Sequence, residues 1–327
     1  MSDVTLLAEV AAFLRQPHGQ FIAGEAVPGN GPTLAVINPA TGKAITEVTA
    51  ADVGQADLAM ASASQAFDSW RAMPTLQRGT LLLRLADLLA SHREELAQLE
   101  SLCSGKTIGL ARMLELDQSV AFLRYFAGWA GKVTGETLDV SLPSMAGEQY
   151  TAFTRRQPVG VVVGIVPWNF SIMIAIWKLA AALVCGCTIV IKPSEYTPLT
   201  LLRVAELAKE AGIPDGVINV VNGAGGEICA DILTNLGATV IPMFCEPDGD
   251  FPNHHPDPVV EANMQALMAR VKEEKADLGI GLDGDADRLG IVDPDGRLLF
   301  GDEVLSLYAR ELLTRKPGST VIADVKC

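Results

Sequence analysis

Basic residues are scarce in this sequence. Its 327 residues include 25 lysines and arginines against 39 aspartates and glutamates, which gives a formal net charge of −14. Because nucleic acids attract basic surfaces, this balance argues against a nucleic-acid partner. The acidic composition is compatible with a soluble enzyme, and acidic side chains could also bind a divalent metal.

Long apolar runs and a basic N-terminal stretch are also missing. The longest apolar run, residues 172–184, is interrupted by Lys178 and is too short to cross a bilayer. Residues 1–4 contain no basic residue ahead of the first apolar stretch, so no secretory signal is predicted. We therefore expect a protein that neither binds a membrane nor is secreted.

Cysteine pairs of the kind that bind zinc are absent as well. The six cysteines are Cys103, Cys185, Cys187, Cys229, Cys245 and Cys327. None of their spacings is that of a zinc site, and Cys185 and Cys187 are too close for an ordinary ligand pair. Reduced, buried thiols in a cytoplasmic protein are the favoured interpretation.

The apolar pattern of the first 221 residues predicts an α/β fold. Residues 51–131 have helical spacing, and a turn at 37–42 separates two extended stretches before them. The β-branched run 159–166 predicts a strand buried on both faces. Further strands are predicted at 188–191 and 217–221, each after a helix, and this alternation indicates parallel βαβ units.

The alternation continues beyond a glycine-rich turn at 222–226. The elements predicted there are a helix at 228–236, strands at 240–244, 278–282 and 320–325, helices at 264–271 and 302–314, and a hairpin around Pro294-Asp295-Gly296. No repeat and no low-complexity linker separates the two halves. Length alone allows two or three domains.

Polar residues follow two predicted strands of the first half. Pro167, Trp168 and Asn169 come after the first strand, and Lys192 and Glu195 end the second. Open parallel sheets bind ligands at the carboxyl ends of their strands. A lysine and a glutamate there suit ribose hydroxyls and phosphate, and an asparagine amide can polarise a carbonyl oxygen. The alternative for the lysine is a solvated charge.

Residues 7–226 resemble the aldehyde dehydrogenase superfamily, in particular its phenylacetaldehyde and betaine-aldehyde types. Besides the motifs above, the segments that carry this resemblance are 21–25, 37–42, 66–70 and 122–129. It implies an incomplete Rossmann-like domain in which Lys192 and Glu195 hold the adenosine ribose of NAD. Asn169 would form one arm of the oxyanion hole. The residues implied to line the cofactor cleft are Ile165, Pro167 and Trp168.

The sequence departs from this family in several places. Ser171 and Ala181 stand where the family usually has proline. The family's next strand, its nucleophilic cysteine and its glutamate general base have no counterpart, and Cys245 has the flanks of another family. Residues 148–158 resemble part of an oligomerisation arm. We expect this segment to have no partner strand within its own chain, and we expect self-association through exposed apolar surface.

The second half contains a loop with three alternating carboxylates. Asp283, Asp285 and Asp287 are separated by single small residues and are followed by Arg288. Hard oxygen ligands on a tight loop favour Mg²⁺. An EF-hand is less consistent with the loop, because the glutamate that ends such a loop is missing. An acidic surface turn is the remaining alternative.

Residues 223–327 resemble the second domain of the α-D-phosphohexomutases, of the phosphomannomutase/phosphoglucomutase type. Segments 244–258, 301–303 and 324–327 carry this resemblance together with the carboxylate loop. It implies an α/β domain with a mixed sheet, Mg²⁺ on the three aspartates, and Arg288 beside the transferred phosphoryl group. The phosphoserine of that family belongs to a different, preceding domain.

The sequence therefore predicts two parts, 1–226 and 227–327, joined at about 222–227. We expect a fusion of an NAD-binding dehydrogenase segment and an Mg²⁺-binding mutase domain, without complete turnover of an aldehyde or a phosphohexose. The strand 217–221 would be shared, so that the second half borrows it. A working enzyme of either type, or a module that only binds Mg²⁺ or NAD, is the alternative.

Overall fold

The computed structural model describes residues 6–140, 150–223, 233–234, 237–245, 252–283 and 288–315. The chain forms two compact units, residues 1–223 and 224–327. Among the helices of these described ranges, none is long and apolar enough to cross a membrane.

The first unit is built on a five-stranded mixed sheet. Its strand order is β2-β1-β9-β8-β7. The bounds are β1 Gln20–Ile22, β2 Glu25–Val27, β7 Val161–Ile165, β8 Thr188–Lys192 and β9 Ile218–Val220. Strands β7, β8 and β9 are parallel, and β1 runs antiparallel to both β9 and β2. The predicted parallel βαβ units are thus confirmed, with two antiparallel strands added at one edge.

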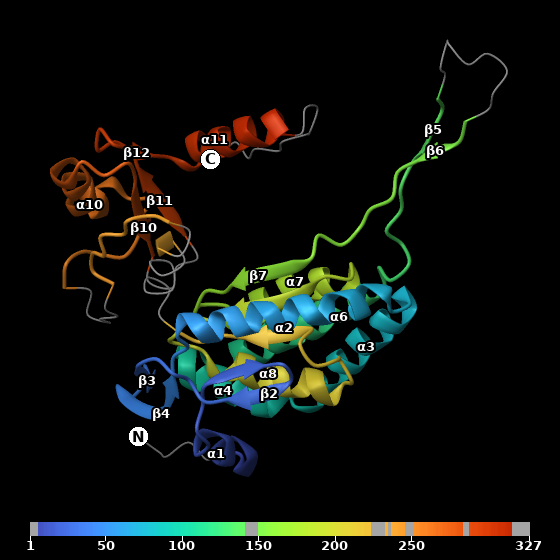
Figure 1. Cartoon of the computed structure of the whole chain (residues 1–327). Coiled ribbons are helices and arrows are strands. Elements are labelled where there is room, and N and C mark those ends of the chain that lie inside the picture. Colours follow the sequence, from blue (N-terminus) through green and yellow to red (C-terminus); the bar gives the residue numbers. More distant parts are fainter. Residues whose placement is uncertain are drawn as a thin grey trace. The chain divides into compact units, whose positions relative to one another are not determined.

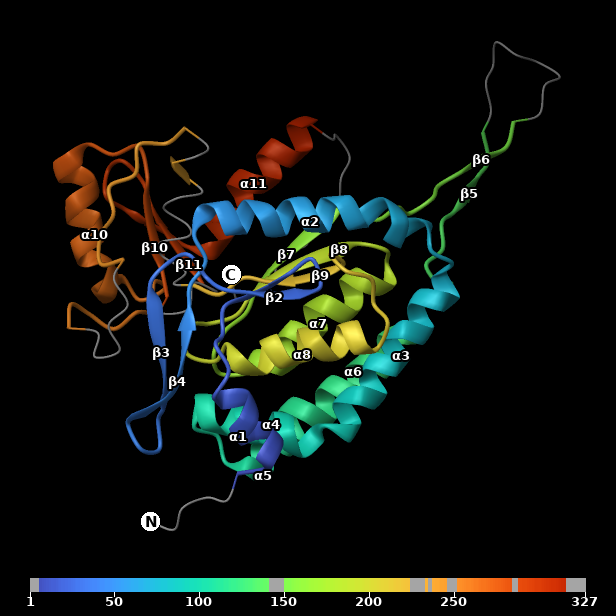
Figure 2. The ribbon, with the colours of Figure 1, turned by 60° about the horizontal axis from the view of Figure 1, so that its bottom comes forward.

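Helices cover both faces of this sheet, as Figures 1 and 2 show. Helix α2 (Val53–Ala72) crosses one face, and α7 (Ser171–Val184) and α8 (Leu199–Glu210) cover the other. A further layer packs on α7 and α8. Its helical segments are α3 Thr75–Ser91, α4 Arg93–Ser104, α5 Ile108–Leu110, the π-helix η1 Ala111–Asp117 and α6 Gln118–Ala127. The short helix α1 (Ala8–Leu14) contacts α4.

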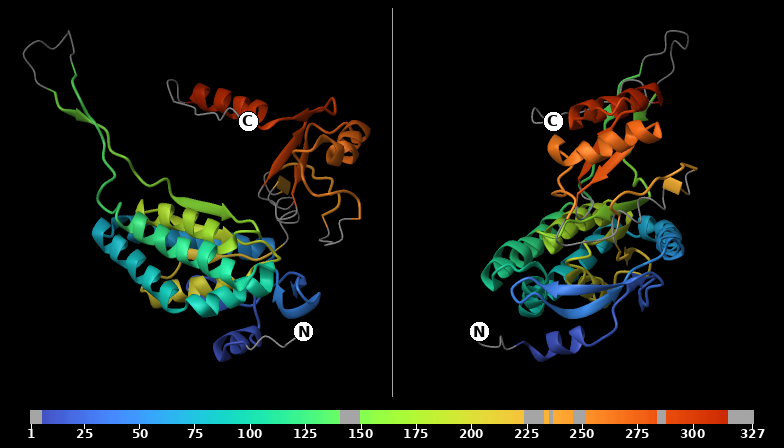
Figure 3. Two further views of the ribbon diagram at one scale, coloured as in Figure 1. Left: turned by 180° about the vertical axis from the view of Figure 1, so that it is seen from behind. Right: turned by 90° about the vertical axis from the view of Figure 1, so that its left-hand side faces the viewer.

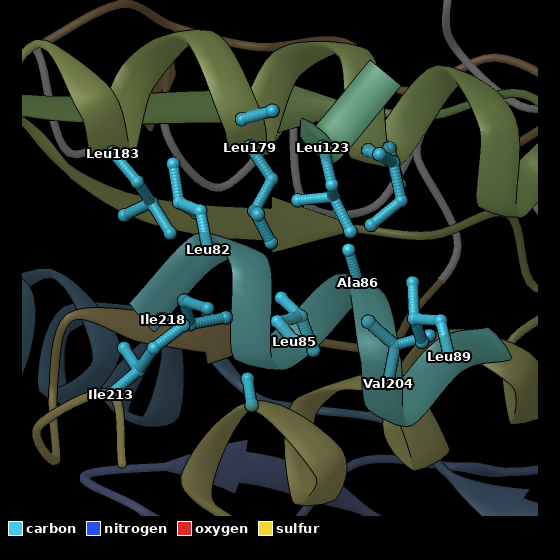
Figure 4. Close-up of a cluster of buried hydrophobic side chains, with 14 of the residues drawn as sticks. Leu82, Leu85, Ala86, Leu89, Leu123, Leu179, Leu183, Val204, Ile213 and Ile218 are labelled. Carbon is cyan, nitrogen blue, oxygen red and sulfur yellow. The ribbon is translucent and has the colours of Figure 1, made fainter. Parts of the chain in front are cut away.

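The leucine stripe of α3 lies at the centre of the core. Leu82, Leu85 and Leu89 are fully buried. Figure 4 shows them between the side chains of α6 and α7 and those of α8 and β9. Burial of each leucine contributes about 2 kcal/mol of transfer free energy. The predicted helical spacing of these leucines is confirmed, and it accounts for the packing of the outer layer.

Strand β7 is less buried than the sequence predicted. Val163 is 56% exposed and Val159 is 87% exposed. Among the described strands only β8 pairs with β7, so β7 lies at the edge of the sheet. Because side chains alternate between the two faces of a strand, the exposed Val163 shows that one face of β7 is open to solvent, and the prediction of burial on both faces is therefore wrong.

Strand β9 and the turn after it belong to the first unit. β9 is hydrogen-bonded to β1 on one side and to β8 on the other. The Asn222 backbone N–H donates to Gln20 Oε1 at 2.6 Å, and its amide Nδ2 donates to the Gly19 carbonyl at 2.5 Å. The Ala51 N–H donates to the Asn222 carbonyl at 2.7 Å. Since both edges of β9 are occupied, the expectation that the second half borrows this strand is wrong.

Two antiparallel hairpins extend the first unit. The strands β3 (Thr33–Asn38) and β4 (Lys43–Thr49) flank the predicted turn. Strands β5 (Thr137–Leu138) and β6 (Ala152–Phe153) pair with each other and lie apart from the layered body in Figure 3. The expectation that residues 148–158 have no partner strand is therefore wrong. The chain folds back on itself instead, and Phe153 remains 70% exposed.

The second unit contains a three-stranded antiparallel sheet of order β10-β11-β12. The elements are β10 Gly279–Leu282, β11 Leu289–Val292, β12 Leu298–Leu299, α10 Glu261–Glu274 and α11 Gly301–Arg315. Met264 and Val271 of α10 are buried in a small core with Val292 and Leu298. These predicted elements and the hairpin are confirmed.

Other predictions for the second unit have different outcomes. Residues 240–244 do not form a strand. Residues 320–325 and most of the helix expected at 228–236 lie outside the described residues. The described strands of this unit are antiparallel throughout, so the mixed sheet expected for it stays a prediction.

Candidate functional site

The loops after β7 and β8 leave the sheet at the same edge. The two strands are parallel and in register up to the pair Ile165 and Lys192, and the Val166 N–H donates to the Lys192 carbonyl at 3.0 Å. After Val166 the chain turns into α7 through three residues that the sequence singled out. Pro167 is buried, whereas Trp168 and Asn169 are exposed. Asn169 is therefore accessible to solvent, in the loop that connects β7 to α7.

The side chains of Lys192 and Glu195 form a buried ion pair. Lys192 Nζ donates to Glu195 Oε2 at 3.3 Å, and the two residues are only 7% and 9% exposed. The alternative of a solvated lysine is therefore wrong. Burying two charges costs desolvation free energy, which the attraction between them offsets only in part. Such a pair offers a cation donor and an anion acceptor side by side, which is the complement of two neighbouring hydroxyl groups.

The structure thus brings the site residues of the first half together at the carboxyl ends of β7 and β8. They are Ile165, Pro167, Trp168, Asn169, Lys192 and Glu195. Ile165 is half-buried, and its carbonyl accepts a hydrogen bond from the Lys178 side chain of α7. The arrangement combines an exposed indole, an exposed amide and a buried ion pair. These groups are chemically complementary to a ring, a carbonyl oxygen and a hydroxyl pair.

A buried cluster of charges lies at the first turns of the helices that follow these loops. It was not predicted from the sequence. Lys106 Nζ is 3.0 Å from Glu100 Oε1 and 2.6 Å from Glu115 Oε1. Both glutamates are completely buried. The one signal in the sequence is that Glu100 occupies an apolar position of its helix, beside Leu99 and four residues after Leu96. A charged residue at a core position indicates a buried partner.

The cluster contacts the first turns of the two helices that follow the site loops. Glu100 Oε2 accepts hydrogen bonds from Ser171 Oγ at 2.7 Å and from Thr200 Oγ1 at 3.0 Å. Glu115 Oε2 accepts from the backbone N–H of Met173 at 3.0 Å. Burial, together with the neighbouring carboxylate of Glu100, raises the pKa of Glu115 to about 7, against the lowering effects of Lys106 and the Met173 N–H.

In the second unit, the carboxylate loop is described only at its two ends. Asp283 Oδ1 accepts from the Arg288 backbone N–H at 3.0 Å, whereas Asp285 and Asp287 lie outside the described residues. The half-exposed guanidinium of Arg288 is 3.6 Å from Asp283 and 3.8 Å from Asp257. Within the described ranges no group of three or more metal-binding side chains is found. The Mg²⁺ site therefore stays a prediction.

Part of the chain matches the phosphohexomutases. Residues 208–296 match the model of the phosphoglucomutase/phosphomannomutase α/β/α domain II. This range begins within α8 and includes β10 and β11. It covers a minor part of the chain and overlaps the dehydrogenase match described next.

Residues 26–244 match the model of the aldehyde dehydrogenase family. Phenylacetaldehyde dehydrogenase from Pseudomonas fluorescens is 51% identical over 223 residues, which cover 67% of this chain and 44% of the relative. Aldehyde dehydrogenase, cytosolic 1 from Rattus norvegicus is 45% identical over 210 residues, which cover 63% and 41%. The chain thus spans less than half the length of these two relatives.

The comparison with solved structures also finds aldehyde dehydrogenases. An aldehyde dehydrogenase from Bacillus cereus, solved as its NAD⁺ complex, is 44% identical and superposes with a TM-score of 0.67 over 71% of this chain and 47% of its own. The mixed α/β architecture of the first unit is shared with it. The chain belongs to the aldehyde dehydrogenase family.

Proposed function

We propose that this chain joins an NAD-binding segment of an aldehyde dehydrogenase to an Mg²⁺-binding domain of the phosphohexomutase type. In this proposal the domain assignment is 1–226 and 227–327. Neither half carries out complete turnover. The observation that carries the proposal is the buried pair of Lys192 and Glu195 beside the exposed Asn169, at the carboxyl edge of two parallel strands.

The residues of this edge fit the ribose end of NAD. Lys192 Nζ can donate to a ribose hydroxyl while Glu195 accepts from its neighbour, and the exposed Trp168 ring offers an apolar surface beside them. Asn169 would donate its amide hydrogens to the carbonyl oxygen of an aldehyde. Bound NAD would supply the hydride acceptor. The NAD⁺ complex of the relative from Bacillus cereus supports this cofactor.

The order of the two family matches along the chain supports incomplete turnover. The dehydrogenase match ends at residue 244, and the mutase match occupies the chain up to 296. Residues that match the mutase domain therefore stand where the nucleophile and general base of a dehydrogenase would be sought. A dehydrogenase segment in turn precedes the mutase domain, where its phosphoserine would be sought. Thiol chemistry needs both a nucleophile and a base.

Calorimetric titration of the full chain with NAD tests the first half of the proposal. Binding should be weakened about tenfold in Lys192→Met, because the donor to the ribose is lost. Lys43→Met, a change at an exposed lysine of β4, serves as the matched control and should bind as the unchanged chain does. An unchanged chain that gives no heat with NAD would disprove the cofactor assignment.

Titration with Mg²⁺ tests the second half. The Asp285→Ala variant should bind Mg²⁺ more weakly than the unchanged chain, because one carboxylate ligand is removed. Asp302→Ala, which removes a carboxylate from the start of α11, is the control. Equal Mg²⁺ affinity in both variants would contradict the three-aspartate site.

Turnover assays separate the fusion from a working enzyme. The full chain should not reduce NAD with phenylacetaldehyde, the substrate in the name of the Pseudomonas relative. It should not convert mannose 1-phosphate in the presence of Mg²⁺ either. Turnover that is lost in Asn169→Ala or in Asp285→Ala would show a working enzyme and overturn this part of the proposal.

A further inference from the structure

One buried carboxylate connects the two helices that leave the site loops. Glu100 Oε2 accepts from Ser171 Oγ, in the first residue of α7, and from Thr200 Oγ1, in the second residue of α8. These contacts join positions 71 and 100 residues apart in the chain. All three residues are completely buried. Glu100 therefore contacts both helix starts at once.

Glu115 supports the same helix start from the other side. The N–H of Met173 is one of the first donors of α7, which have no acceptor within the helix. Glu115 Oε2 accepts from it at 3.0 Å, and a negative charge at this end is favourable for the helix dipole. The charged groups that face Glu115 are Glu100 of α4 and Lys106 of the α4–α5 connection.

The short loops before these helices carry the residues that are proposed to bind NAD. Only Phe170 separates Asn169 from Ser171, and α8 begins four residues after Glu195. The α7 start has no side-chain cap of its own. We propose that Glu100 and Glu115, held by Lys106, are positioning residues that set the conformation of both loops. The link to NAD rests on the proposed function; the effect on the loops does not.

The arrangement makes the loop sensitive to the charge of the cluster. When Glu115 loses its proton, two carboxylates share one ammonium group, and the acceptor for the Met173 N–H becomes stronger. Trp168 lies next to Asn169 in the loop and therefore reports on its conformation. Trp70 of α2 is fully buried, and its Nε1 donates to the carbonyl of Leu183, at the opposite end of α7 from Ser171, so it serves as an internal reference.

Fluorine NMR of the full chain labelled with 5-fluorotryptophan tests the effect on the loop. The four tryptophan signals are assigned by single replacements with phenylalanine. The Trp168 signal should titrate between pH 5.5 and 8.5 in the unchanged chain and should not titrate in Glu115→Gln. The Trp70 signal should stay constant. A Trp168 signal that is independent of pH, and identical in the unchanged chain, Glu100→Gln and Glu115→Gln, would overturn the proposal.

Two milder variants distinguish an effect on the loop from misfolding of the chain. Ser171→Ala removes one hydrogen bond to Glu100 and keeps every charge. It should therefore shift the Trp168 signal, while thermal unfolding of the variant remains cooperative. Glu47→Gln changes an exposed glutamate of β4 and should leave all four signals in place. A Trp168 signal unaffected by Ser171→Ala in a folded chain would contradict the role of Glu100.

The NAD affinity provides the second readout. Glu100→Gln should weaken NAD binding about tenfold, because two loops are displaced together, and Glu47→Gln should leave it unchanged. Unchanged affinity in Glu100→Gln would disprove positioning for the cofactor. Absence of NAD binding in the unchanged chain would instead disprove the proposed function, and the fluorine spectra would then decide whether the cluster positions the loops.

Discussion

Ser171 Oγ donates a 2.7 Å hydrogen bond to Glu100 Oε2, and both side chains are inaccessible to solvent. The contact depends on the serine hydroxyl group, which a proline at position 171 would lack. It makes the start of α7 depend on a carboxylate that lies 71 residues earlier.

The raised pKa of Glu115 predicts that the first unit loses stability as the pH rises. Burial and the Glu100 carboxylate raise this pKa from the ordinary 4.5 to about 7. Between these values the folded chain holds a proton that the unfolded chain has lost, so the free energy of unfolding falls from about pH 4.5 to about pH 7. Urea unfolding followed by tryptophan fluorescence measures it, because all four tryptophans lie in residues 1–223. Glu115→Gln should flatten this dependence, and Glu47→Gln should retain it.

Removal of Lys106 should destabilise the first unit strongly. Lys106→Met leaves Glu100 and Glu115 buried without their shared cation, which should cost about 3–5 kcal/mol of unfolding free energy. The same urea experiment measures the loss. Adding Glu115→Gln to Lys106→Met should recover part of the stability, because one uncompensated charge disappears. A loss below about 1 kcal/mol would contradict the assignment of a buried charge cluster.

The buried Arg78 side chain should be more important for stability than its exposed neighbour Arg71. Its guanidinium donates to the carbonyls of Met73 at 2.6 Å and Val184 at 3.3 Å, beside the ends of α2 and α7. Arg78→Met leaves these acceptors without a donor and should cost about 3 kcal/mol. Arg71→Met breaks an exposed ion pair with Asp68 and should cost less than about 1 kcal/mol. Equal losses would contradict a stabilising role for the hydrogen bonds from Arg78 to Met73 and Val184.

Residues 1–223 should fold without the second unit. Both neighbours of β9 belong to this range, and Asn222 is tied to Gln20 and Gly19. A fragment of residues 1–223 should therefore unfold at the same urea concentration as the full chain. The fragment 1–215 is the control, because it loses the buried Ile218 and Val220 from the middle of the sheet. We expect no cooperative unfolding transition for this shorter fragment.

Local patterns predicted most elements of the fold correctly. The leucine spacing of α3, the hairpin β11–β12 and the alternation from β7 to β9 could be read directly, because each depends on residues close in the chain. The motifs around Asn169 and Lys192 were found for the same reason. Whether a strand lies at an edge or in the middle was not predicted, as β7 and β9 show, because it depends on pairing with distant segments.

The sequence by itself determined most of the element types, the family of the first half and the two strand-end motifs, since these are properties of contiguous residues. Only the tertiary structure showed that Lys192 and Glu195 are buried against each other and that β9 belongs to the first sheet. It alone brought Glu100 and Glu115 to the starts of α7 and α8. Contacts across 58 to 100 residues depend on how whole helices pack, and no local spacing encodes them.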